Sequence, residues 1–234
     1  MSLPKRFYQN VDVAERDGGN APLLDGKPIR TPGKRELLLP SRALAEAVAA
    51  EWRTQKETID PATMPLTKLA NSAIDGVTGR EEDVIGDILA YAGSDLLCYR
   101  ADGPGGLIAA QAAHWDPVLA WAKAALGAQL ALAQGVVHVA QPQAALDRLR
   151  EALRDHDPFG LAALHVMTGL TGSALLALAV ALGRLTPEEA WKAAHVDEDW
   201  QIAQWGEDAE AASRREARWR DFAAAARWLA LLQD

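Results

Sequence analysis

The pattern of this sequence changes once, at Pro40. Before this point, short apolar stretches alternate with turn-forming residues, and Asp25-Gly26 separates two of them. An Asp-Gly pair tolerates the positive φ angles of a tight turn, so residues 23–30 predict a β-hairpin. Pro28 cannot donate to a central strand and therefore indicates an edge strand or a bulge. With a further short strand expected over 36–39, the first forty residues predict a small antiparallel β unit.

After Pro40 the apolar residues recur at helical spacing. Ser41 is a suitable N-cap for the first helix. Later helices are predicted over residues 66–77, 80–93, from 107 onward, 143–154, 159–169, 172–185, 187–206 and 208–232. We expect an interruption at Asp116-Pro117, because Asp can cap a helix and Pro can open one. Residues 136–139 could form an isolated strand.

The predicted fold class is therefore α+β. We expect a small antiparallel β-rich N-terminal domain over residues 1–40, followed by a larger all-α C-terminal domain over residues 41–234. The 234 residues are enough for such an arrangement, and a hydrophobic fraction of 49% is ordinary for a protein with a buried core.

Charge and cysteine content exclude several classes of protein. The formal net charge of −8 argues against an electrostatic grip on nucleic acid or on anionic membranes. The single cysteine, Cys98, cannot form an internal disulfide, which fits a reducing compartment. The N-terminus has no apolar run typical of a signal peptide, and acidic residues come too early for a transit segment.

One apolar segment must be weighed as a membrane contact. Residues 159–183 contain no Asp, Glu, Lys or Arg and are long enough to span a bilayer. Gly and Thr residues lie in the middle of the segment, however, and much of the rest is alanine. Two buried helices that meet at a Gly/Thr turn explain the segment better, and a peripheral membrane protein remains the alternative.

The sequence carries no local catalytic or metal-binding motif. Its five histidines are scattered, with no pair four residues apart and no cysteine nearby, so we expect no metal site. There is no nucleophile elbow and no dinucleotide-binding fingerprint, so we expect no cofactor and assign no catalytic residue. A discontinuous active site between the β unit and the helices remains an alternative hypothesis.

Tryptophan is unusually frequent, with eight residues against three phenylalanines and three tyrosines. Tryptophan is favoured at protein interfaces, although most tryptophans in a helical protein pack helices together. On a single helix over residues 187–206, one apolar face would consist of Trp191, Ala194, Ile202 and Trp205. Glu198 would lie near the middle of this face and Trp200 would point away from it, a pattern that favours contact with a partner. Alternatively, the helix restarts with Asp197 as its N-cap, which would make Glu198 an ordinary first-turn acid.

Blocks of residues that span nearly the whole chain resemble a known family. These blocks are Arg6-Phe7-Tyr8, Leu24 to Lys34, Leu39-Pro40, Ala50-Glu51-Trp52, Met64 to Asp75, Asp95 to Arg100, His114 to Pro117 and Gln201 to Gly206. Their succession resembles the assembly chaperones of ATP synthase that are dedicated to the α subunit of the catalytic sector (the Atp-twelve type). The likeness is weaker over residues 127–185.

This resemblance implies a chaperone, not an enzyme. It would bind the unassembled α subunit and shield the surface of that subunit that faces β, until β displaces it. The resemblance also implies a β-rich N-terminal part, a helical C-terminal part and no nucleotide hydrolysis. We expect a monomer in the bacterial cytoplasm, or in the mitochondrial matrix for a processed organellar form.

The resemblance also suggests roles for individual residues. The expected partner contacts are Glu198, Trp200, Gln201 and Trp205. Trp52 is expected to pack the β unit onto the helical part. Asp95, Tyr99 and Arg100 could contact the partner, or they could include an internal ion pair that shapes a domain junction.

Overall fold

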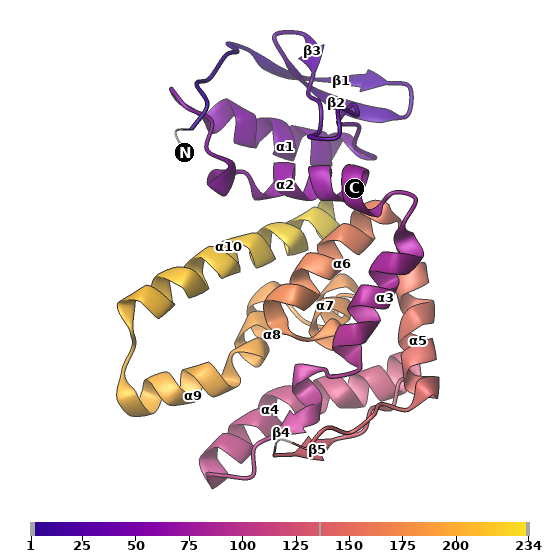
Figure 1. Cartoon of the computed structure of the whole chain (residues 1–234), viewed down its shortest axis with the longest axis vertical. Helices are drawn as coiled ribbons and strands as arrows, with labels where there is room; N and C mark the ends of the chain where they lie inside the picture. Colours follow the sequence, from indigo (N-terminus) through magenta and orange to yellow (C-terminus); the bar gives the residue numbers. More distant parts are fainter. Residues whose placement is uncertain (1–2, 136, 233–234) are drawn as a thin grey trace. The chain divides into compact units, whose positions relative to one another are not determined.

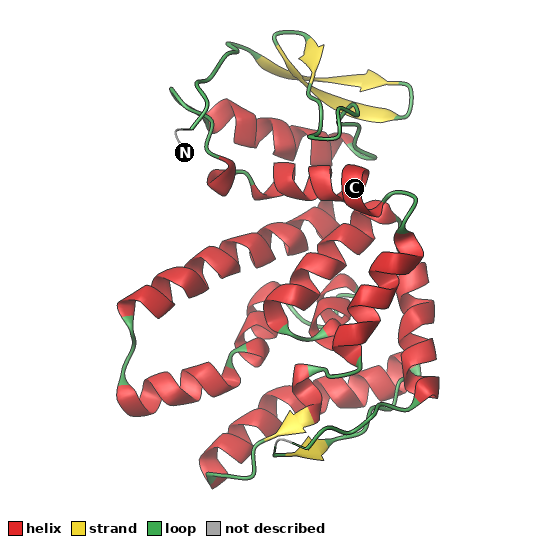
Figure 2. Cartoon of the chain, in the orientation of Figure 1, coloured by secondary structure: helices red, strands yellow, loops and turns green. Residues whose placement is uncertain are grey.

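The structure is a computed structural model that describes residues 3–135 and 137–232. It confirms the α+β class, with a small N-terminal antiparallel sheet followed by helices (Figures 1 and 2). The chain forms two compact units. The first comprises Met1–Glu81, Pro158–Ala163 and Ala224–Asp234, and the second comprises Glu82–Asp157 and Leu164–Ala223. The boundary predicted after residue 40 follows the change in secondary structure and stays a prediction.

The sheet of the first unit has the order β1-β2-β3 and is antiparallel throughout. Its strands are β1 (Val11–Arg16), β2 (Gly19–Leu24) and β3 (Lys27–Pro28). Asp25 and Gly26 turn between β2 and β3 with φ angles of 47° and 78°, which confirms the predicted hairpin. Pro28 lies in an edge strand, as expected. Residues 36–39 form no strand, because their two isolated bridges join different partners, Arg30 and Asn20, and build no continuous ladder.

The helix α1 (Arg42–Thr54) lies along one face of this sheet (Figure 1). Ser41 caps it as predicted, because its hydroxyl accepts a hydrogen bond from the Leu44 N–H at 3.1 Å. Near the other end of α1, Glu51 accepts hydrogen bonds from the backbone N–H groups of Leu66 and Thr67 at 2.7 and 2.8 Å. These N–H groups belong to the first turn of α2 (Pro65–Ser72), which follows the 3₁₀ turn η1 (Pro61–Thr63). A side chain of α1 therefore caps α2.

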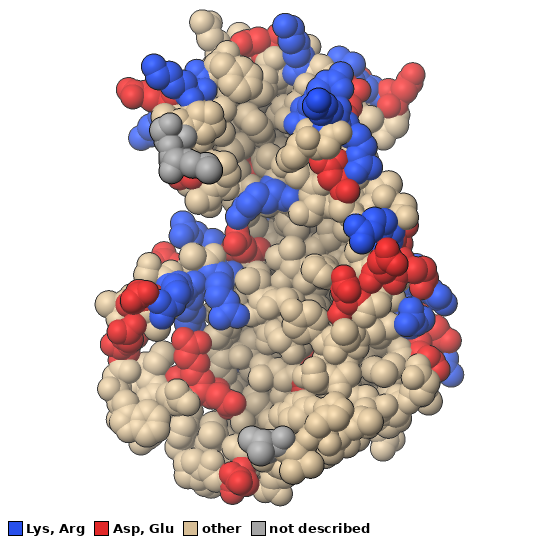
Figure 3. Space-filling model, in the orientation of Figure 1, with Lys and Arg blue, Asp and Glu red and all other residues tan. Residues whose placement is uncertain are grey.

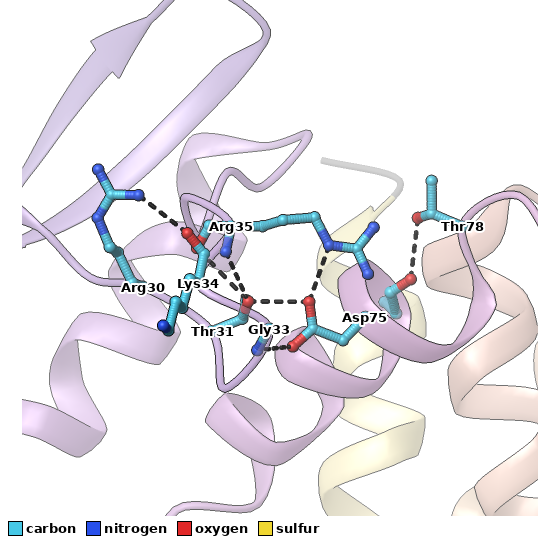
Figure 4. Close-up of polar contacts among 8 residues, drawn as sticks. Arg30, Thr31, Gly33, Lys34, Arg35, Asp75 and Thr78 are labelled. Atoms are coloured by element: carbon cyan, nitrogen blue, oxygen red, sulfur yellow. Dashed lines mark hydrogen bonds and ion pairs between the residues drawn. The ribbon is translucent and has the colours of Figure 1, made fainter.

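Asp75 joins the loop after β3 to η2 (Ala73–Val77), a π-helical turn that continues α2 (Figure 4). Its carboxylate accepts hydrogen bonds from Thr31 Oγ1, Gly33 N and Arg35 Nε at 2.9, 2.7 and 2.9 Å. Desolvation raises the pKa of Asp75, but these hydrogen bonds and the Arg35 charge outweigh it and lower the pKa overall. A Cβ on Gly33 would lie 2.7 Å from Asp75 Oδ1, so this contact requires glycine.

Two distant segments complete the first unit. They are the start of α6 (Pro158–Thr171) and the end of α10 (Ala209–Leu232). The fully buried Trp228 stacks on Phe159 at 6.3 Å between ring centroids and donates its indole N–H to the Phe159 carbonyl at 3.0 Å. Ser41 Oγ donates to the Leu231 carbonyl at 2.7 Å, which ties the start of α1 to the last turn of α10.

The second unit is mainly helical. Its elements include α3 (Glu81–Ala92), η3 (Leu96–Cys98), β4 (Tyr99–Arg100), α4 (Gly105–Trp121), η4 (Ala122–Leu126), β5 (Ala133–Gln134), α5 (Gln143–Arg154), α7 (Ala174–Ala181), α8 (Pro187–Ala194) and α9 (Val196–Trp205). Most apolar side chains of residues 159–183 are buried, as the core interpretation of this segment predicts. Among the described residues, no helix combines the length and the apolar character that a membrane crossing needs.

Three local predictions for this unit are wrong. The helix α4 continues through Asp116-Pro117, because Trp115 and Val118 are both buried and their packing offsets the cost of proline inside a helix. A short strand forms at residues 133–134, where it pairs in parallel with β4, and residues 137–139 are not in a strand. Val136 lies outside the described residues. The segment 187–206 is two helices, which meet at His195.

Candidate partner-binding surface on α9

The break at His195 decides which side chains of the segment 187–206 are exposed. Trp191 and Trp205 do not share a face, since Trp191 is 8% exposed and packs on Trp219 and Phe222, whereas Trp205 is 79% exposed. A restarted helix is confirmed, but the predicted N-cap at Asp197 is wrong, because the N-cap position is His195. Glu198 is therefore a first-turn acid of α9.

The N-terminal turn of α9 is fixed to its neighbours by polar contacts. Gln111, buried in α4, donates its side-chain N–H to Asp197 Oδ1 at 2.7 Å. Arg215 of α10 donates to Asp199 Oδ1 at 2.5 Å. Neither Gln111 nor Arg215 stood out in the sequence, because the two residues lie 86 and 16 positions from their partners. These contacts hold the start of α9 in place while its C-terminal half stays exposed.

Trp200 is only partly exposed because its indole packs on the first turn of α4. A Cβ on Gly106 would lie 2.3 Å from Trp200 Cη2, so glycine leaves the space that the indole fills. Beside Trp200 is a cleft of about 210 Å³, lined also by His114, Lys192 and Asp199. Burial and the nearby Lys192 lower the pKa of His114, although Asp199 acts in the opposite direction. The indole thus forms one wall of a small cleft.

Among the described residues, the only basic side chain within ion-pair distance of Glu198 is that of His195. The carboxylate Oε2 of Glu198 lies 3.9 Å from Nε2 of His195, and the Glu198 side chain is 38% exposed. Burial lowers the pKa of His195, while a hydrogen bond to the Trp191 carbonyl only partly offsets this. Because His195 is then neutral near pH 7, the Glu198 carboxylate remains available to a group outside the chain.

The surroundings of α9 are acidic. Residues 196–211 contain six acidic residues and no Lys or Arg, and Gln201 and Trp205 are exposed among them. In contrast, the 44 residues from 103 to 146 contain only Asp116 and Lys123 as charged groups. Figure 3 shows this as a broad uncharged area where α4 and β5 lie. An acidic, tryptophan-bearing helix therefore packs against a helix with few charges.

Asp95 lies inside the second unit and has no exposed surface. Its two oxygens accept hydrogen bonds from Leu97 N at 3.1 Å and from Leu175 N at 3.2 Å, and the Ser173 hydroxyl also donates to it. Burial raises the pKa of Asp95 to about 6, against the effect of these donors. Asp95 therefore caps η3 and the start of α7 from within, and a partner in solution cannot reach it.

Tyr99 and Arg100 contact different groups. The Tyr99 hydroxyl lies 3.0 Å from Nδ1 of His138. Arg100 donates to the Leu97 carbonyl at 3.0 Å, forms an ion pair with Asp116 at 2.6 Å and lies over the Trp115 ring. Arg100 thus forms an internal ion pair, with Asp116 and not with Asp95. A role for these residues at a domain junction stays a prediction.

Trp52 belongs to the first unit, where it contacts the N-terminal segment. Its ring meets the Tyr8 ring edge-on at 5.7 Å, and its carbonyl accepts a hydrogen bond from the Tyr8 hydroxyl at 2.7 Å. These contacts attach the start of the chain to α1. The predicted role of Trp52 in packing the β unit onto the helical part stays a prediction.

Among residues 3–135 and 137–232, no three His, Cys, Asp or Glu side chains are grouped so that they could hold a metal ion. Burial and the nearby Asp95 charge raise the pKa of Cys98 to about 12, so this thiol is not an activated nucleophile.

Known proteins share the fold of this chain. A family model described as ATP12 chaperone protein matches residues 5–123. A crystal structure of a protein from Agrobacterium tumefaciens, assigned as a chaperone, is 52% identical over 98% of this chain and 87% of its own, with a TM-score of 0.95. Atp12 from Paracoccus denitrificans is 43% identical over 98% of both chains, with a TM-score of 0.91. These matches cover both units.

Proposed function

Because the chain belongs to the ATP12 chaperone family, whose members act in ATP synthase assembly, we propose that it binds the unassembled α subunit of the catalytic sector. It holds this subunit through α9, with Glu198, Trp200, Gln201 and Trp205 as contacts. The bound chaperone shields the surface of the α subunit that faces β.

The exposure of Trp205 is the observation that carries this proposal. A tryptophan that is 79% exposed contributes little to the core of its own chain, yet tryptophan is the residue most enriched at binding hot spots. Polar contacts fix the start of α9, and Glu198 and Trp205 lie seven residues apart, about two turns along the same side of this helix. The surface of an unassembled subunit resembles an opened core, and exposed aromatic groups can cover such a surface.

Release of the client needs no fuel in this scheme. A β subunit that binds the same surface of the α subunit more tightly displaces the chaperone by competition. Each α subunit that binds β is no longer free to bind the chaperone, so the complex of α with the chaperone dissociates. The chaperone therefore acts stoichiometrically.

Co-purification with isolated α and β subunits tests the proposal. We expect capture of α and not of β, and release of α when β is added. Trp205→Ala and Glu198→Ala should each weaken capture about tenfold or more, as hot-spot truncations do, without lowering the melting temperature.

Leu182→Ala is a matched control for Trp205→Ala, because Leu182 is a 49% exposed apolar residue of the second unit outside α9. It should capture α normally. Trp52→Ala should instead lower thermal stability, because it removes the contact with Tyr8. Two results would overturn the proposal. One is folded wild-type protein that captures neither subunit, and the other is α9 variants that capture the α subunit as well as the wild type does.

A further inference from the structure

The first unit contains a second candidate binding surface, a cleft between the N-terminal segment, the β2–β3 hairpin and α1. The cleft has a volume of about 550 Å³. Its apolar and aromatic lining includes Phe7, Tyr8, Leu24, Ile29 and Trp52. A cleft of this size, lined by aromatic groups with a few polar ones, is typical of a ligand or peptide site.

Phe7 has no evident role in the fold. Its side chain is 73% exposed, and its ring meets the Tyr8 ring edge-on at 5.4 Å. Tyr8, in contrast, is buried, and desolvation raises the pKa of its hydroxyl despite the nearby Arg6 charge. An exposed phenylalanine beside a cleft lined by Tyr8 and Trp52 would bury apolar area only when something enters the cleft.

Trp52 contributes a polar group to the cleft that needs a hydrogen-bond partner. Its indole Nε1 is buried and has no hydrogen-bond acceptor among the described residues. A buried donor without an acceptor costs about 1–3 kcal/mol, and such groups in native proteins call for an explanation. An occupant that brings a carbonyl or carboxylate oxygen into the cleft would give this donor a partner, after a small shift of the side chains that cover it.

Two of the three charged side chains in the cleft lining are positive. The one acid in the lining, Asp25, is already engaged, because its carboxylate accepts hydrogen bonds from the backbone N–H groups of Gln9 and Asn10. Among the described residues, Arg30 donates one side-chain hydrogen bond, to the Lys34 carbonyl, and the exposed Lys27 forms no ion pair. The cleft therefore combines aromatic walls with two cations against one engaged carboxylate, which favours an occupant that is apolar and anionic.

From this combination we propose that the cleft binds a short peptide segment of a partner protein in which an aromatic or aliphatic side chain is flanked by carboxylates. The apolar side chain packs against Phe7 and the cleft lining. A backbone oxygen of the segment accepts from Trp52 Nε1, and its carboxylates face Lys27 and Arg30. This surface belongs to the first unit and does not depend on the function proposed for α9.

Nuclear magnetic resonance on the full-length protein tests the proposal directly. The probes are a small set of capped hexapeptides with Leu, Phe or Trp at the centre and Glu on both sides, together with a twin set in which Lys replaces Glu. The indole N–H signal of Trp52 is assigned by its absence from Trp52→Phe. We expect glutamate peptides to shift this signal in a saturable way and lysine peptides to leave it unchanged.

Matched variants separate the cleft from general charge effects. Lys27→Glu should weaken binding of the glutamate peptides about tenfold or more, whereas Lys56→Glu, an exposed lysine of the same unit outside the cleft, should not. Phe7→Ala should also weaken binding, whereas Leu3→Ala, another exposed apolar residue of the N-terminal segment, should leave it unchanged. These substitutions lie at exposed positions, so folding is not at risk.

Three results would overturn the proposal. The first is that no glutamate peptide shifts the Trp52 signal, and the second is that the lysine peptides bind equally well. The third is that the Trp52 signal shifts with protein concentration in the absence of peptide, because the protein forms a dimer that Phe7→Ala abolishes. That result would assign the cleft to a second copy of this chain.

Discussion

At the scale of single residues, Asp95 shows how a buried charge serves structure. Its carboxylate caps two helical segments from inside the second unit, where backbone N–H groups and the Ser173 hydroxyl donate hydrogen bonds to it. Burial nevertheless raises its pKa from 3.8 to about 6, which means that desolvation outweighs these donors. The folded protein therefore binds a proton at Asp95 more tightly than the unfolded chain does.

This difference predicts a pH dependence of stability with a definite sign. The stability that protonated Asp95 contributes is fully present below pH 3.8 and is lost as the pH rises through about 6. The loss amounts to about 3 kcal/mol at neutral pH. Asp95→Asn cannot ionise, so the free energy of unfolding of this variant should fall less between pH 4 and pH 7 than that of the wild type. Urea unfolding at several pH values measures this, and parallel pH profiles would contradict it.

At the scale of elements, the contact between α4 and α9 decides how the candidate surface is presented. Gly106 leaves room for the Trp200 indole, and Gln111 holds the first turn of α9 through Asp197. Both contacts come from the N-terminal half of α4, so the position of α9 depends on two residues that carry no chemical signature of their own.

Replacing Gly106 by alanine should therefore displace Trp200. Gly106→Ala places a Cβ 2.3 Å from the indole and should make Trp200 more accessible to acrylamide quenching, at a cost of about 1–3 kcal/mol in stability. Gly105→Ala is the matched control, because a Cβ there meets nothing within 4 Å and alanine favours the helix. Equal quenching and stability in both variants would show that Trp200 does not need this space.

At the scale of the whole molecule, the first unit is assembled from three stretches of the chain. Its sheet, α1 and α2 come from the first 81 residues, whereas Phe159 and Trp228 come from segments far along the sequence. The two units also differ in charge. The first has 13 Lys and Arg against 12 Asp and Glu, and the second has 11 against 20. The acidic character of the chain therefore belongs to the helical unit that carries α9.

Removal of Trp228 should destabilise the N-terminal sheet, although the two lie about two hundred residues apart. Trp228→Ala should cost about 3–5 kcal/mol, because the side chain is fully buried. Hydrogen exchange in β1, β2 and α1 should accelerate. Trp219→Ala on the same helix lies in the second unit, so the faster exchange that it causes should stay there. Unchanged exchange in the sheet of Trp228→Ala would show that the first 81 residues fold without this contact.

Local chemistry was enough to predict much of this protein from its sequence. The Asp25-Gly26 hairpin, the Ser41 cap and the edge position of Pro28 were all predicted correctly, because each depends on backbone preferences within a few residues. The α+β class followed from the change in pattern at Pro40. The family followed from blocks of residues in a specific order, which the match over residues 5–123 confirms.

Only the tertiary structure decided how these elements are used. The packing of Trp115 and Val118 carries α4 through Pro117, and the turn at His195 separates the buried Trp191 from the exposed Trp205. The hydrogen bond between Gln111 and Asp197 and the packing of Trp200 on Gly106 join positions about 90 residues apart. Such contacts are formed by groups that meet only after the chain has folded, and local sequence preferences carry no record of them.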